Sequence, residues 1–151
     1  RLFLYAAFAD AFWRGATASR DLDLAAIAAK AEKETAYHLR HSAEWLIRLG
    51  DGTGESHLRA QAAVDRLWPY VGEMFEAEDE VLVAADICPD PPGLRDGWNA
   101  NVDAVLAEAT LMRPADGWMQ SGGRAGRHTE HLGHMLAVMQ SVARMHPGAR
   151  W

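Results

Sequence analysis

Two groups of glutamate and histidine residues give this sequence its chemical interest. Glu34 is followed four residues later by His38, and Glu130 is followed by His131 and His134. Side chains three or four residues apart lie on the same face of an α-helix. Imidazole and carboxylate groups gathered in this way can bind a transition metal. They can equally form a network of hydrogen bonds and ion pairs, or lie at a solvated surface.

The helices that must carry these groups follow from the apolar spacing. Apolar residues that recur at intervals of three and four predict helices over about 5–16, 22–49, 56–75, 94–113 and 127–145. Pro69 should kink or break the third of these helices. The segment 88–93, CPDPPG, predicts a loop, and Gly50-Asp51-Gly52 should end the second helix. The sequence therefore predicts an all-α protein with a single domain over residues 1–151.

The second predicted helix has an unusual core-facing stripe. Its apolar members are predicted to be Leu24, Ile27, Ala28, Ala31, Trp45, Leu46 and Leu49. The same spacing places Glu34, His38 and His41, together with Ser42, in the middle of that stripe. A buried carboxylate without a partner costs several kcal/mol, so we expect it to face a metal, an imidazolium or a basic side chain.

Inward-facing carboxylates and histidines on long helices suggest a ferritin-like helical bundle. Its di-iron site takes a Glu from each of two helices and a Glu-x-x-His pair from each of the other two. No Asp or Glu in this sequence has a His three residues later; Tyr37 follows Glu34 at that spacing and Gly133 follows Glu130. The sequence therefore has the helix pattern of such a bundle but lacks the Glu-x-x-His pairs of its metal site.

The composition limits the classes of partner and the cellular compartment that we expect for this protein. The formal net charge is −6, which disfavours nucleic acid as a partner. The single cysteine, Cys88, cannot form an internal disulfide, which fits the cytoplasm. No apolar run is long enough to span a membrane. Arg124 and Arg127, beside a glycine-rich connector before the last helix, form either a candidate anion site or part of a plain loop.

Two long stretches resemble a known family. Residues 29–56, AKAEKETAYHLRHSAEWLIRLGDGTGES, and 121–140, SGGRAGRHTEHLGHMLAVMQ, are similar to the phenylacetic acid catabolism proteins. The nearest branch is formed by the C-type subunits of the phenylacetyl-CoA ring 1,2-epoxidase. LWPYVGEMFEAED at 67–79 and the ending PGARW are similar as well, so the resemblance covers essentially the whole chain.

The resemblance implies a structural role within a cytosolic multicomponent monooxygenase. That complex epoxidises the ring of phenylacetyl-CoA with O2 and electrons from NADPH, delivered by a reductase subunit. Its catalytic subunit holds the di-iron centre, and the C-type subunit is a ferritin-like relative that lost its metal site. We therefore expect no cofactor in this chain. The expected partners are the di-iron subunit and the other epoxidase subunits, with phenylacetyl-CoA met only indirectly.

The same resemblance places a degenerate metal site at Glu34, His38, Glu130 and His131. It also implies that the N-terminal helices of the family are missing from this chain, which would leave apolar surface exposed. Arg124 and Arg127 could contact CoA phosphates across a subunit interface. The alternative is an independent ferritin-like metal-binding oxidase that uses Glu34, His38, Glu130 and His134.

Overall fold

The computed structural model describes residues 1–77 and 80–150. The chain divides into two compact units, Arg1–Gln120 and Ser121–Trp151, and each is described here by itself. Every regular element among the described residues is helical, which confirms the predicted all-α class. None of the described helices is both long and apolar enough to cross a membrane. The prediction of a single domain stays a prediction.

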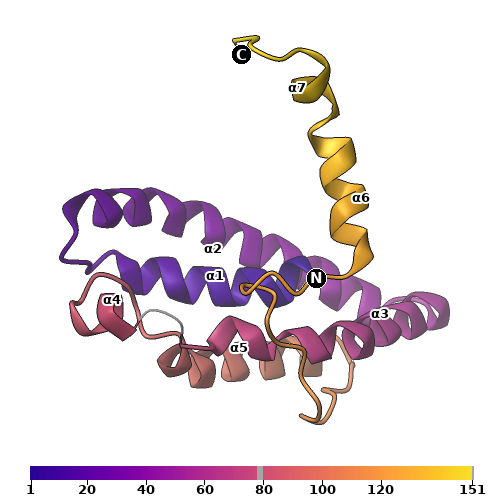
Figure 1. Cartoon of the computed structure of the whole chain (residues 1–151). Coiled ribbons are helices and arrows are strands. Elements are labelled where there is room, and N and C mark those ends of the chain that lie inside the picture. Colours follow the sequence, from indigo (N-terminus) through magenta and orange to yellow (C-terminus); the bar gives the residue numbers. More distant parts are fainter. Residues whose placement is uncertain (78–79, 151) are drawn as a thin grey trace. The chain divides into compact units, whose positions relative to one another are not determined.

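The first unit is built on an antiparallel pair of helices (Figure 1), α1 (Leu2–Ala16) and α2 (Leu22–Gly50). The Asp21 side chain caps α2 by accepting hydrogen bonds from the backbone N–H groups of Asp23 and Leu24, both at 3.0 Å. The helix ends at Gly50, as the Gly50-Asp51-Gly52 sequence predicts. The spacing of apolar residues therefore located both helices within a few residues.

The next helix is shorter than its apolar spacing indicates. Helix α3 (Gly54–Leu67) begins with a capping box in which Thr53 and Ser56 satisfy each other's backbone N–H groups. It ends two residues before Pro69, and the chain continues as two 3-10 turns, η1 (Trp68–Tyr70) and η2 (Gly72–Phe75). The predicted break at Pro69 is confirmed, because proline has no N–H for the helical hydrogen bond and its ring crowds the preceding turn.

The remainder of the first unit contains α4 (Glu80–Ala84), η3 (Pro92–Leu94) and α5 (Arg95–Glu108). The prediction that the helix reaches residue 113 is wrong. Thr110 adopts a positive φ of 57°, and the N–H of Leu111 donates to the carbonyl of Leu106 at 2.8 Å. This left-handed residue closes the helix and turns the chain away from its axis.

The core of the first unit is aromatic. The rings of Trp98 and Trp68 lie 5.8 Å apart, and Phe75 packs edge-on against Trp98 at 5.3 Å. The indole N–H of Trp98, which is 1% exposed, donates to the carbonyl of Leu4 at 2.9 Å. The indole N–H of Trp68 donates to Asp116 at 3.0 Å. Both buried indoles thus have a polar partner, and their rings join α1, α5 and the turn after α3.

The second unit is a turn followed by two helices, α6 (Glu130–Met139) and α7 (Ser141–Met145). One continuous helix over 127–145 was predicted, and the structure corrects both its start and its continuity. The carbonyl of Gly122 accepts the N–H groups of Ala125 and Arg127, which holds the chain in a turn before the helix.

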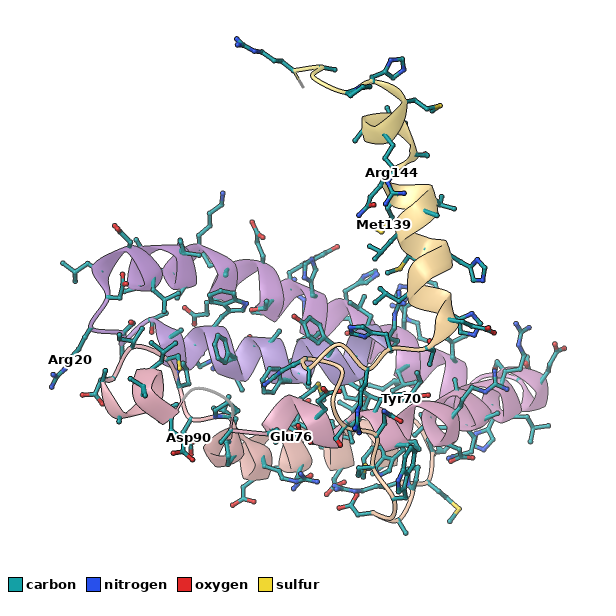
Figure 2. The ribbon with its side chains drawn as sticks, in the orientation of Figure 1. Arg20, Tyr70, Glu76, Asp90, Met139 and Arg144 are labelled. Atoms are coloured by element: carbon teal, nitrogen blue, oxygen red, sulfur yellow. The ribbon has the colours of Figure 1, made fainter. Side chains whose placement is uncertain are left out.

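The interruption of this helix lies at Gln140, between Met139 and Arg144 in Figure 2. The hydroxyl of Ser141 donates to the carbonyl of Val138 at 2.8 Å and competes with the backbone pattern. The guanidinium of Arg144 donates to the side-chain carbonyl of Gln140 at 2.6 Å and bridges the break. The two short helices are therefore linked by side chains where the regular backbone pattern stops.

Candidate functional site

The face of α2 that carries Glu34, His38 and His41 is exposed, which corrects the prediction that these groups are buried. The buried residues of this helix are Ala28, Ser42 and Gly50. Three of the apolar residues expected to lie inside are exposed, among them Ile27, at 58%, and Trp45, at 49%. Ala28 and Ser42 are buried as predicted, and elsewhere the buried stripe is rotated by about one residue around the helix relative to the predicted stripe.

The physical reason for this rotation is the size of the side chains. Helix α2 turns small residues toward its neighbours, and a close approach between helices needs small residues at the contact. Ser42 can be buried there because its hydroxyl donates to the carbonyl of His38, one turn back, at 2.6 Å. Leu39 and Leu46 pack partly against the core. Large residues lie on both sides of α2, so spacing alone does not decide which side is buried.

The exposed face of α2 carries a ladder of rings, which we call the aromatic stripe: Tyr37, His41 and Trp45. Tyr37 stacks on His41 with ring centroids 5.8 Å apart and an interplanar angle of 16°. His41 meets Trp45 edge-on at 6.4 Å. These residues are four apart, so each ring reaches the next along one face of the helix.

Two arginines extend the aromatic stripe. The guanidinium of Arg40 lies 5.8 Å from the ring centroid of Tyr37, and that of Arg48 lies 5.5 Å from that of Trp45. Cation–π contacts at exposed positions are worth about 0.5–1 kcal/mol. The stripe combines flat apolar surface with positive charge, a composition that is typical of binding surfaces and not of an isolated metal site.

Glu34 and His38 lie one turn apart on this exposed face. Glu34 borders a shallow hollow of about 510 Å³, which is also lined by Ile27 and Lys30. Among the described residues, no three His, Cys, Asp or Glu side chains converge as metal ligands would. Glu34 and His38 alone do not fit a di-iron centre, which needs several carboxylates and Glu-x-x-His pairs.

The histidines of the second unit also lie at the surface. Glu130 occupies the first turn of α6, where a negative charge is favourable beside the positive end of the helix dipole. Glu130, His131 and His134 are all exposed. Glu34 and His38 belong to the first unit and these residues to the second, so their joint role in a degenerate site stays a prediction.

Arg124 and Arg127 are exposed in the turn that precedes α6. Gly122 has a φ of +89°, which L side chains rarely adopt, so this turn favours glycine, and a Cβ there would also lie 2.8 Å from Cδ of Arg127. The aliphatic part of Arg127 therefore covers Gly122, and the backbone of the turn is fixed by the bonds to the Gly122 carbonyl. A role of both arginines in anion binding stays a prediction.

The sequence reasoning missed a groove of about 640 Å³ in the first unit, which we call the apolar groove although Arg1, Glu55 and Arg59 also line it. Its walls include Phe3 from α1, Leu46 and Leu49 from α2, and Val64 from α3. Leu49 is 45% exposed although it was predicted to be buried. The residues come from three helices, so only their packing reveals the groove, and no local motif could have indicated it.

A tight corner follows α2 directly after Leu49. The carbonyl of Gly50 accepts hydrogen bonds from Nδ1 of His57 at 2.8 Å and from the hydroxyl of Thr110 at 3.3 Å. A Cβ at Gly50 would lie 2.2 Å from the carbonyl oxygen of Ala109. The corner therefore requires glycine, and it ties the end of α2 to α3 and to the chain after α5.

Comparison with known proteins decides the family. The family model of the phenylacetic acid catabolic proteins matches residues 1–151. The chain belongs to this family. Membership confirms the resemblance that was drawn from the two long stretches of sequence. Together with the observed helices, it also confirms the ferritin-like class of the fold.

A curated relative comes from Escherichia coli (strain K12) and is described as the C subunit of 1,2-phenylacetyl-CoA epoxidase. The two sequences are 49% identical over 135 residues, which is 88% of this chain and 54% of the relative. The chain thus spans about half the length of the curated relative that it matches.

Proposed function

We propose that this chain is part of a structural, non-catalytic subunit of a multicomponent phenylacetyl-CoA ring 1,2-epoxidase. The complex would act in the cytoplasm in aerobic phenylacetate degradation. The observation that carries the proposal is the 49% identity, across 88% of the chain, to the C subunit of a 1,2-phenylacetyl-CoA epoxidase. The family match over residues 1–151 supports a place in phenylacetate catabolism.

The residues of this chain favour a structural role over a catalytic one. An O2-activating di-iron centre needs Glu-x-x-His pairs whose two side chains reach the metal from adjacent turns. Tyr37 and Gly133 occupy the positions of those histidines after Glu34 and Glu130. We therefore assign the iron to a catalytic partner subunit. We derive no step of the oxidation through this chain.

The proposal is tested by assembly. The natural subunit that contains this chain would be purified with and without the other epoxidase subunits. Native mass spectrometry, elemental analysis and NADPH-dependent turnover would then be measured on each sample. We expect a stable heteromer with the di-iron subunit, iron in that partner, and turnover only in the assembled complex. Near-stoichiometric iron and turnover in the isolated subunit would overturn the proposal and favour the independent oxidase.

We further propose that Glu34 and His38, with Glu130 and His131, are the remnant of the ancestral metal site. A double-mutant cycle with Glu34→Gln and His131→Gln tests this in the natural subunit. Residues that interact in one network should show a coupling energy of about 0.5 kcal/mol or more. Additive effects would contradict the remnant site.

His38→Ala separates this remnant from the alternative site of Glu34, His38, Glu130 and His134. The remnant predicts that His38→Ala leaves the iron content of the complex unchanged. The alternative predicts that iron uptake by the isolated subunit is lost. The matched control is His146→Ala, which removes an exposed histidine after α7 that neither site includes.

Arg124 and Arg127 are our proposed contacts to the phosphates of CoA in the assembled complex. Guanidinium groups bind phosphate oxygens in a bidentate manner. Charge reversal of both should weaken acyl-CoA binding by the complex, measured by calorimetry at fixed salt. The control is charge reversal of Arg59, an exposed arginine of α3. Unchanged affinity would remove the two arginines from the proposal and leave the structural role in place.

A further inference from the structure

We draw no further inference here: the strongest candidate, the exposed aromatic stripe of α2 together with the apolar groove beside Leu49, is an unpartnered surface, and nothing in the structure shows what covers it.

Discussion

The two faces of α2 differ in the size of the side chains that they present. The buried face presents small residues, Ala28, Ser42 and Gly50, whereas the exposed face presents the large rings of Tyr37, His41 and Trp45. The rings are an exception to the usual rule that large apolar residues lie inside, whereas Leu39 and Leu46 of the same helix pack partly against the core. The small residues of the helix allow a close approach to its neighbours, and its rings remain outside.

The difference between the two faces of α2 indicates which residues stabilise the first unit. The rings of the core come from other elements, among them Trp98 from α5 and Phe75 from the turns after α3, together with Phe8 from α1. The rings of α2 contact mainly one another and two arginines of the same helix. Substitutions in the two sets should therefore have very different costs.

The largest effect is expected for Trp98→Ala. Removing a buried tryptophan should lower the free energy of unfolding by about 3–5 kcal/mol, because a cavity forms and the Leu4 carbonyl loses its donor. Trp45→Ala is the matched control on the aromatic stripe and should cost clearly less, because Trp45 is 49% exposed. Urea unfolding followed by circular dichroism measures both. Equal losses would show that the two tryptophans are equally buried in solution.

A smaller loss is expected at the corner after α2. Gly50→Ala should destabilise the fold by about 1–3 kcal/mol, because the new Cβ would press on the Ala109 carbonyl and force the chains apart. The gain in helix propensity, about 1 kcal/mol, offsets part of this loss. Gly54→Ala is the control, since nothing lies within 4 Å of its Cβ position. A Gly50→Ala variant as stable as the Gly54→Ala variant would contradict the close approach.

Much of this architecture could be predicted from the sequence, and the errors have physical causes. Asp21 and Gly50 locate the two ends of α2, because capping residues and glycines act within a few residues of the chain. Pro69 is equally local in its effect. The orientation of α2 was wrong because both of its sides carry large residues. Only the packing of α1 against it decides between them.

Some features of the candidate site could likewise be predicted from the sequence, and others could not. Family membership could be predicted because the two long stretches that carry the resemblance are each continuous in the sequence, and the family model matches residues 1–151. The stacking of Tyr37 on His41 also follows from spacing within one helix, once the helix is known to be exposed there. The apolar groove could not be predicted, because Phe3, Leu46 and Val64 come together only in the packed unit.

A third test compares two histidines that the sequence does not distinguish. His57→Ala removes the bond from Nδ1 to the Gly50 carbonyl and should cost about 1 kcal/mol. Thr110 continues to donate to that carbonyl, which limits the loss. His38→Ala, on the exposed face, should stay within about 0.5 kcal/mol in this chain. Thermal unfolding at pH 8 compares the stability of the two variants. A larger loss of stability for His38→Ala would contradict the assignment of His38 to the exposed face of α2.

The smallest effect is expected within the aromatic stripe itself. Because Tyr37 and His41 are exposed and four residues apart, their stacking should contribute about 0.2–0.5 kcal/mol. A double-mutant cycle of Tyr37→Ala and His41→Ala in this chain measures that coupling by chemical unfolding. A coupling above about 1 kcal/mol would mean that the stripe is buried in solution, which the exposed face of α2 does not allow. The same cycle in the assembled complex sharpens the comparison, since a stripe covered on assembly must show a larger coupling there than in the isolated chain.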